Sequence, residues 1–299
     1  MKKTKLIAIV LCIVMMLSVL SGCGGNEGVV VASKQFTESI VLGEILAQLI
    51  EAKTDIPVTR KMNLGDTAVL IPAMQNGEVD IYFEYSGTAY GTILNQELKP
   101  GMTADEVMTA ARKGMDEQFG ITVFDAVGNN NTYALAMKTE KMHNLGITKI
   151  SDLTALAPQL KFGGNHVFYT RVQDGYEGVT KTYSLNFKES LKMDKTLLYE
   201  AIGSGDLDVI VVFGTDSLLK KYEMTVLEDD KNVFPPYQGA PMCLNSTLEQ
   251  YPELNEVLNL LVGLITDEIA QDLNYQVDVE QRSVEDVARD FLAKNGLVD

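Results

Sequence analysis

Short apolar runs alternate with longer amphipathic stretches along the first hundred residues. The apolar runs at residues 29–33 and 79–85 have the length of buried strands, and residues 57–62 are predicted to form a further strand between them. Thr37 precedes the first amphipathic stretch as a candidate N-cap, and Asp66 opens a second one that runs to Gln75. This alternation of strand and helix patterns predicts an α/β fold with largely parallel sheets.

A helix–turn–strand pattern occurs twice in the chain, at a constant offset of 128 residues. The first copy contains Ala73, Gly77, Asp80 and Tyr85, and the matching residues of the second are Ala201, Gly205, Asp208 and Phe213. Chance similarity is one interpretation. The other is two similar α/β lobes, each carrying an aromatic ring at the carboxyl end of a strand, where ligands bind in open α/β sheets.

Two polar, turn-rich segments mark the points where the chain would cross between lobes. They lie at residues 128–135 (GNNNTYAL) and 228–241 (EDDKNVFPPYQGAP). We therefore expect lobe I to comprise residues 28–126 plus 235–299, and lobe II to comprise residues 127–234. Two crossing segments make a hinge, which is the architecture of clamshell binding proteins.

The amino-terminal residues 1–22 predict a lipoprotein signal peptide. Lysines at the start are followed by the apolar run IAIVLCIVMMLSVL, and LSGC places small residues directly before Cys23. An ordinary signal peptide or a membrane anchor is the alternative. With Cys23 lipidated, the protein is expected to be extracytoplasmic and anchored to the cell membrane by its acyl chains.

The charge balance and the scarcity of cysteine and histidine argue against several classes of function. Without the three lysines of the signal, 22 basic residues face 41 acidic residues, a net charge of −19, which disfavours nucleic-acid binding. Cys243 would be the one remaining free thiol, and His143 and His166 lie in separate segments, so we expect no metal site. We also find no nucleophile–base motif and no phosphate-binding glycine loop, and therefore expect neither an enzyme nor a bound cofactor.

Motifs along the whole mature chain resemble the substrate-binding proteins of osmoprotectant ABC importers. They include SKQFTESIVLGEI, GEVDIYFEYSGT, NNTYALAM, FYTRVQDGYEG, FGTDSLLKKY and LEDDKNVFPPY. The resemblance implies a two-lobed type II periplasmic-binding-protein fold in a protein that we expect to be monomeric. It further implies capture of quaternary ammonium solutes such as glycine betaine, carnitine or choline, and their delivery to an ABC permease and its ATPase.

The same resemblance implies a set of ligand-binding residues. The positions that match its motifs are Lys34, Gln35, Tyr85, Thr88, Tyr133, Arg171, Phe213 and Tyr237. The aromatic members would form a cage, and Lys34, Arg171 and Thr88 would hold a carboxylate. Two departures bear on the ligand, since the acidic residue before F-x-x-R is replaced around 165–167, and Asp66 follows LG where relatives often have glycine. If Asp66 faces the cleft, its charge would favour choline.

An aromatic cage suits a trimethylammonium group because that cation has no N–H to donate and is weakly hydrated. Each cation–π contact contributes about 0.5–2 kcal/mol, so four rings supply roughly 2–8 kcal/mol. A micromolar site needs about 8 kcal/mol net, so a second anchor is expected. Binding of another small cationic or zwitterionic solute, or a sensory role for the lipoprotein, remains an alternative, whereas an enzyme on the same fold lacks support.

Overall fold

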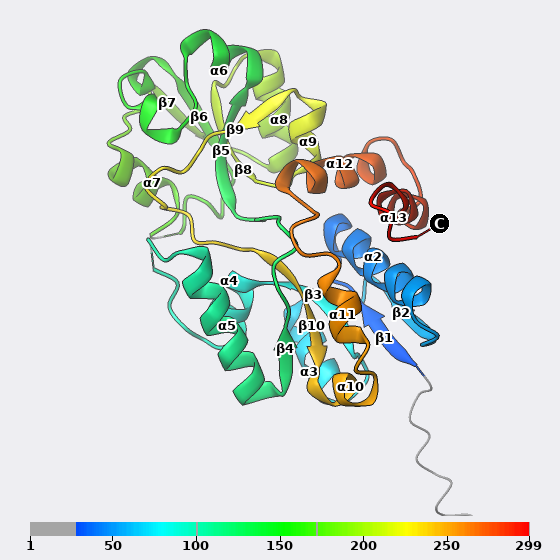
Figure 1. The fold of residues 1–299 in the computed structure, drawn as a ribbon. Helices are drawn as coiled ribbons and strands as arrows, with labels where there is room; N and C mark the ends of the chain where they lie inside the picture. The colour runs from blue at the N-terminus through cyan, green and yellow to red at the C-terminus, as the bar shows by residue number, and fades with distance from the viewer. Residues whose placement is uncertain (1–27, 100, 172, 299) are drawn as a thin grey trace, which may run out of the picture.

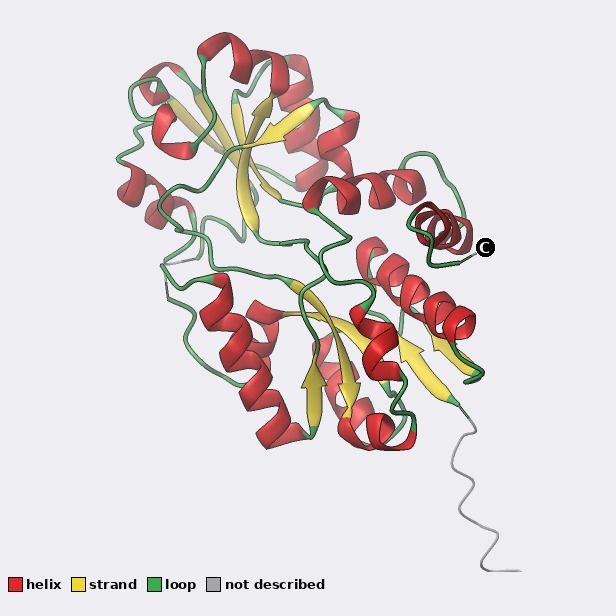
Figure 2. Cartoon of the chain, viewed as in Figure 1, coloured by secondary structure: helices red, strands yellow, loops and turns green. Residues whose placement is uncertain are grey.

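The computed structural model describes residues 28–99, 101–171 and 173–298. The predicted signal peptide at residues 1–22 and the predicted lipidation site Cys23 lie outside these residues. The described chain forms two five-stranded mixed sheets with helices packed around them, arranged as two lobes (Figure 1; Figure 2).

The sheet of lobe I has the strand order β2-β1-β3-β10-β4. Its strands are β1 (Val29–Ala32), β2 (Val58–Lys61), β3 (Ile81–Tyr85), β4 (Ile121–Val123) and β10 (Gly239–Leu244). The helices from the amino-terminal part are α2 (Thr37–Lys53), α3 (Thr67–Gln75), α4 (Ser86–Thr88), the π-helical turn η1 (Ala89–Ile93) and α5 (Ala104–Phe119). The carboxyl-terminal helices are α10 (Asn245–Gln250), α11 (Leu254–Asn259), α12 (Asp267–Asp278) and α13 (Val284–Lys294).

The sheet of lobe II has the strand order β7-β6-β8-β5-β9. Its strands are β5 (Tyr133–Lys138), β6 (Lys161–Gly164), β7 (Glu189–Lys192), β8 (Val209–Phe213) and β9 (Met224–Val226). Its helices are α6 (Thr139–Leu145), the short 3-10 turns η2 (Ile150–Leu153) and η3 (Ala157–Gln159), α7 (Tyr176–Tyr183), α8 (Lys195–Ser204) and α9 (Ser217–Lys221).

The two lobes repeat one topology, as the offset of 128 residues predicts. In each lobe the repeated strand, β3 or β8, has a parallel neighbour on one side and an antiparallel neighbour on the other. In each lobe the helix before this strand is followed within two residues by a glycine with positive φ, +70° at Gly77 and +85° at Gly205, a conformation that glycine adopts without a steric penalty. The repeated aspartates also match: Asp80 accepts a hydrogen bond from Val30 N at 2.7 Å, and Asp208 accepts one from Lys161 N at 2.6 Å.

Side chains of the central strands face two cores, one on each side of the sheet. In β1, Val29 and Val31 pack with α2 and the carboxyl-terminal helices, whereas Val30 and Ala32 pack with α3 and α5. The predicted elements of the first hundred residues are confirmed, with one correction. The N-cap of α2 is Phe36 rather than Thr37, because Thr37 already lies in the helix and its hydroxyl donates to Asp278 Oδ1 at 2.6 Å.

Two segments, 124–132 and 227–238, connect the sheets and pair with each other between the lobes (Figure 1). Asn130 and Gln238 form an isolated antiparallel bridge, and Asn131 N donates to Tyr237 O at 3.0 Å. Helix α12 adds a contact between the lobes, since it packs against α2 and also against α9. The hinge is therefore a paired two-stranded connection braced by a helix.

Within the described residues, no helix combines the length and the apolar character needed to cross a membrane.

Candidate functional site

A cavity of about 490 Å³ lies where the carboxyl ends of β3 and β8 face each other across the hinge. That volume is in the range of small-molecule sites. Its lining residues from lobe I and the hinge are Lys34, Phe36, Thr37, Glu38, Tyr85, Thr88, Asn131 and Tyr237. Those from lobe II and α12 are Lys195, Phe213, Thr215, Asp216, Ser217, Asn274 and Asp278. The cavity therefore has walls from both lobes.

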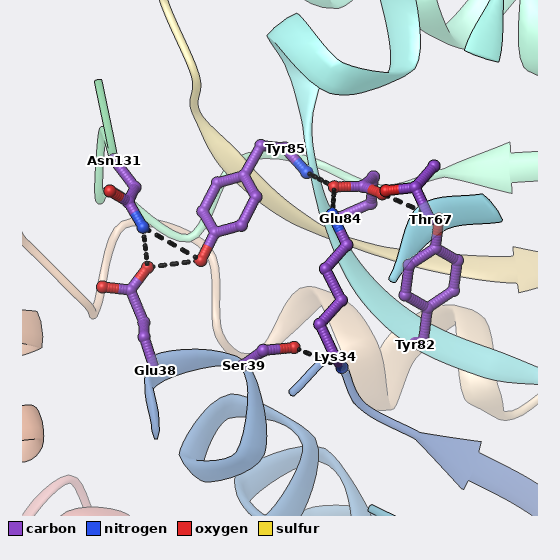
Figure 3. A network of polar contacts seen from close by, with 8 residues as sticks. All are labelled: Lys34, Glu38, Ser39, Thr67, Tyr82, Glu84, Tyr85 and Asn131. Atoms are coloured by element: carbon purple, nitrogen blue, oxygen red, sulfur yellow. Dashed lines mark hydrogen bonds and ion pairs between the residues drawn. The ribbon is translucent and has the colours of Figure 1, made fainter. Parts of the chain in front are cut away.

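Tyr85 ends β3, and its ring belongs to the cavity wall while only 5% of the residue is exposed. The Tyr85 hydroxyl donates to Glu38 Oε1 at 2.5 Å. Glu38 Oε1 also accepts a hydrogen bond from Asn131 Nδ2 at 3.2 Å (Figure 3). The Phe36 ring stacks beside it, with ring centroids 6.3 Å apart. These contacts hold the Tyr85 ring in one orientation.

A second buried carboxylate, Glu84, lies behind Tyr85 and is fully inaccessible. It accepts from Lys34 Nζ at 2.5 Å, Thr67 Oγ1 at 2.9 Å, Tyr82 OH at 3.0 Å and the Tyr85 backbone N–H at 2.8 Å (Figure 3). All of these partners belong to lobe I. Glu84 thus braces the strand end and holds the Lys34 ammonium, 5.6 Å from the centroid of the Tyr85 ring.

Gly87 in the EY-x-GT motif allows the hinge to approach the end of β3. A Cβ atom at this position would lie 2.8 Å from the Tyr237 ring and 2.7 Å from Pro236 O, both closer than real Cβ contacts. Glycine is therefore required for Tyr237 to reach the cavity beside Tyr85.

Lobe II presents its ring in a more open environment. Phe213 ends β8 with 38% of its surface exposed, and it stacks on Tyr133 at 4.6 Å between ring centroids. The Arg171 guanidinium carbon lies 5.2 Å from the centroid of the Tyr133 ring, and Arg171 forms an ion pair with Asp174. Tyr133 and Arg171 thus support Phe213 from the side, outside the set of residues that line the cavity.

The structure brings five of the nine predicted ligand-binding residues into one cavity. They are Lys34, Tyr85, Thr88, Phe213 and Tyr237. Tyr133 and Arg171 lie behind Phe213, as described above. Gln35 and Asp66 are exposed side chains that do not line the cavity, and Asp66 occupies the N-cap position of α3.

Several lining residues were not singled out from the sequence. Phe36, Thr37 and Glu38 belong to the SK-x-F-T-E motif, so this motif could have pointed to them. Asn274 and Asp278 lie on α12, about 190 residues from Tyr85 along the chain, within the stretch ITDEIAQDLNYQVDVE, which also resembles the family but did not single them out. Only the packing of α12 between the lobes brings them to the cavity.

The charged groups at the cavity are largely paired with one another. Lys34 pairs with Glu84, and Lys195 Nζ lies 2.7 Å from Asp216 Oδ2. Glu38 is held by neutral donors instead, and Asp278 accepts hydrogen bonds from the hydroxyls of Thr37 and Ser217 at 2.6 and 2.8 Å. The lining consequently carries an excess of carboxylates over ammonium groups, which favours a cationic group in the cavity.

Burial changes the titration of three groups around the cavity. It raises the pKa of Glu38, against the effect of the hydrogen bonds that the carboxylate accepts. Burial, together with the neighbouring Glu38 charge, holds the pKa of Tyr85 well above its usual value. Burial also raises the pKa of Asp267 to about 6, although this carboxylate accepts a hydrogen bond from the hinge residue Asn130.

Among residues 28–99, 101–171 and 173–298, no group of three or more His, Cys, Asp or Glu side chains has the arrangement of a metal site. Cys243 is buried in β10 of lobe I, away from the cavity lining.

Comparison with known proteins gives consistent matches over nearly the whole chain. Residues 27–294 match the family described as the substrate-binding domain of ABC-type glycine betaine transport systems. The carnitine transport binding protein OpuCC of Listeria monocytogenes is 33% identical over 280 residues, which cover 92% of this chain and 90% of that protein.

A second relative is the ergothioneine transport permease/ergothioneine binding protein EgtU of Helicobacter pylori, 36% identical over 273 residues. This alignment covers 91% of the chain but only 48% of that relative, so the chain spans about half its length. Among solved structures, that of a glycine betaine/carnitine/choline ABC transporter superposes with a TM-score of 0.86 at 32% identity, covering 91% of this chain and 100% of that one. This superposition confirms the two-lobed fold expected from the sequence.

Proposed function

Because the chain belongs to the family of substrate-binding domains of ABC-type glycine betaine transport systems, we propose that it captures a quaternary ammonium solute between its two lobes. The family resemblance and the type II periplasmic-binding-protein fold predicted from the sequence are both confirmed. The family consists of transport binding proteins, which return their ligand unchanged.

The observation that carries this proposal is the cavity lined by aromatic rings from both lobes and from the hinge. Phe36, Tyr85 and Tyr237 approach it from lobe I and the hinge, and Phe213 approaches it from lobe II. Ring faces combine apolar surface with a negative quadrupole, which is the environment that a trimethylammonium group favours. The ligand would be enclosed when the lobes close on it.

The carboxylate of a betaine ligand would be held at the edge of the same cavity. Lys34 and Thr88 line it, and Arg171 lies beside it on Tyr133. Arginine grips a carboxylate through two hydrogen bonds, and to do so Arg171 would exchange Asp174 for the ligand. Gln35 and Asp66 are exposed and do not line the cavity, so they would lie outside these contacts.

We further propose the cellular setting that the family suggests. Lipidation of Cys23 would anchor the mature chain to the cell membrane on its extracytoplasmic side. The monomeric chain would release its ligand to an ABC permease driven by its ATPase. Closure would move lobe I, residues 28–126 plus 235–299, relative to lobe II, residues 127–234.

Ergothioneine is a second candidate ligand, because a relative that is 36% identical over 91% of this chain is an ergothioneine binding protein. This compound also carries a trimethylammonium group and a carboxylate, and its imidazole ring adds polar groups. The amides of Asn131 and Asn274 in the cavity wall offer partners for such groups.

Titration calorimetry on the purified protein tests the proposal. The panel is glycine betaine, carnitine, choline and ergothioneine, with dimethylglycine as the control that lacks the quaternary nitrogen. Tighter binding of betaines than of choline would support Lys34, Thr88 and Arg171 as the anchor for the ligand carboxylate. Binding of choline alone would indicate that the excess of carboxylates in the cavity lining selects the ligand. No heat with any member of the panel would contradict the proposal.

A further inference from the structure

Glu38 is a buried carboxylate of the cavity wall that the proposed ligand contacts leave without a role. It lies in the first turn of α2, and 4% of the residue is exposed. Its Oε1 accepts from Tyr85 OH at 2.5 Å, Asn129 Nδ2 at 3.0 Å and Asn131 Nδ2 at 3.2 Å. Its Oε2 accepts from Asn274 Nδ2 at 3.1 Å. These donors favour the ionised carboxylate, which would otherwise be costly to bury.

The donors to Glu38 come from lobe I, the hinge and helix α12. Tyr85 ends β3 of lobe I, and Asn129 and Asn131 lie on the hinge. Asn274 lies on α12, and its amide also donates to Thr215 O of lobe II at 2.9 Å. Glu38 thus connects the ring of Tyr85 to the hinge directly and to lobe II through Asn274.

The hydrogen bond from Tyr85 also affects the electron density of its ring. Tyr85 OH donates to the Glu38 carboxylate, and a hydrogen bond to an ionised acceptor is charge-assisted. A phenol that donates a hydrogen bond to a carboxylate stays protonated but is polarised, so that electron density on its oxygen and ring increases and its ring face becomes more negative. Cation–π attraction depends on the negative charge of that face, and therefore increases.

We propose that Glu38 is a positioning residue for ligand capture, which holds the Tyr85 ring in the cavity, makes its face more attractive to a cation, and couples it to the hinge and lobe II. This inference rests on the proposed function, since it assigns Tyr85 to a quaternary ammonium ligand. Glu38 itself need not contact the ligand, because protein donors already occupy both of its oxygens.

The chain offers a matched control in Glu44, on the same helix. Glu44 is also buried, with 3% of the residue exposed, but it pairs with Arg60 and accepts from Gln48 Nε2, away from this cavity. In the full chain, Glu38→Gln should lower the affinity for glycine betaine and choline about tenfold or more, the size of a strong cation–π contact. Glu44→Gln should leave both affinities within about twofold, whatever stability it loses.

A second measurement separates an effect on the ring from general damage to the site. Each cation is compared with its neutral carbon isostere, in which a tert-butyl group replaces the trimethylammonium group. Loss of the Glu38 charge should reduce the preference for the cation over the isostere, because only the cation responds to the ring quadrupole. Thermal unfolding of the ligand-free proteins checks that each variant is folded. If Glu38→Gln does not fold, Tyr85→Phe replaces it, because this variant removes the same hydrogen bond from the ring side.

The outcomes distinguish this inference from the proposed function. A wild-type protein that binds no quaternary ammonium compound would contradict the proposed function. A wild-type protein that binds one, with Glu38→Gln unchanged in affinity or weakened equally for cation and isostere, would overturn the role of Glu38 alone. If the isostere binds too weakly to be measured, the cation affinities of Glu38→Gln and Glu44→Gln are compared instead. Equal affinities in these two variants would then overturn the role of Glu38.

Discussion

Tyr85 and Phe213 occupy equivalent places in the two lobes, yet their surroundings differ. Tyr85 is 5% exposed, its hydroxyl donates to Glu38, and its backbone N–H donates to Glu84. Phe213 is 38% exposed, has no hydroxyl, and stacks on Tyr133. The same topology thus delivers both rings, but only the ring of lobe I is held by a polar network.

This difference suggests a division of labour in ligand capture. Lobe I carries a preorganised ring surface, with two buried carboxylates that brace it on either side. Lobe II carries an exposed ring whose apolar surface would be covered when a ligand and the facing lobe enclose it. Preorganisation reduces the ordering cost of binding, so the ring of lobe I is expected to contribute more to affinity.

Replacing each ring by alanine gives the largest expected effect and tests this asymmetry directly. Tyr85→Ala removes a cation–π contact of about 2 kcal/mol and should weaken binding of the preferred quaternary ammonium ligand roughly thirtyfold. Phe213→Ala removes an exposed contact of about 1 kcal/mol, or roughly fivefold. Titration calorimetry measures both, with Tyr251→Ala as a control for loss of a tyrosine outside the cavity. Equal losses from both rings would contradict the asymmetry.

Removing the hydroxyl from Tyr85 should change the free energy of unfolding more than adding a hydroxyl to Phe213. Tyr85→Phe removes a hydrogen bond to a buried charged group and should lower the free energy of unfolding by about 1.5–3 kcal/mol. Phe213→Tyr adds a hydroxyl at an exposed position and should change it by less than about 0.5 kcal/mol. Urea unfolding compares the two.

The Tyr85→Phe background also tests the link to Glu38. If Glu38 acts on affinity through the Tyr85 hydroxyl, then Glu38→Gln should weaken ligand binding much less in this background than in the wild type. Independent, additive losses in a double-mutant cycle measured by calorimetry would show that Glu38 acts by another route.

A smaller, pH-dependent effect on stability is expected from Asp267, the buried carboxylate that accepts a hydrogen bond from the hinge residue Asn130. The pKa of Asp267 rises from its usual 3.8 to about 6 on burial, so the folded state holds its proton more tightly than the unfolded state. Its contribution to stability is therefore complete below pH 3.8 and is lost as the pH rises through about 6. Compared with the wild type, Asp267→Asn should show a weaker decline of unfolding free energy across that range in urea titrations. Parallel curves would contradict the raised pKa.

The smallest effects are expected outside the cavity. Gln35→Ala and Asp66→Asn change exposed side chains that do not line it, and each should alter ligand affinity less than about twofold. Calorimetry with both choline and glycine betaine is the measurement, since a selective gain or loss for choline in Asp66→Asn would restore Asp66 as a selector.

Much of the architecture was predictable from the sequence because it depends on local patterns. Periodicity located the early strands and helices to within a residue or two. Helix α2 begins one residue earlier than a Thr37 N-cap implies, because its N-cap is Phe36, and the hydroxyl of Thr37 is used by the distant Asp278. Such long-range use of a capping residue has no local signal.

The candidate site was predictable only in part. Tyr85 and Phe213 follow from the repeat, because equal positions in equal topologies bring their strand ends to the same cleft. Glu38 belongs to a recognised motif, but its role depends on donors from β3, the hinge and α12, which only the fold assembles. Asp66 was another candidate, but the sequence left open whether its side chain faces the cleft. The fold places it at the N-cap of α3, where it is exposed and does not line the cavity.

The sequence by itself therefore determined the two α/β lobes, the crossing segments, the family and the rings at the strand ends, because these depend on hydrophobic periodicity, turn residues and contiguous motifs. The tertiary structure decided which charges are paired, which ring is held and which residues share the cavity. Those properties depend on burial and on hydrogen bonds between residues far apart in the sequence, such as Glu38 and Asn274, which are 236 positions apart. Such polar contacts are strong because they are shielded from water, and only the folded structure determines which of them are buried.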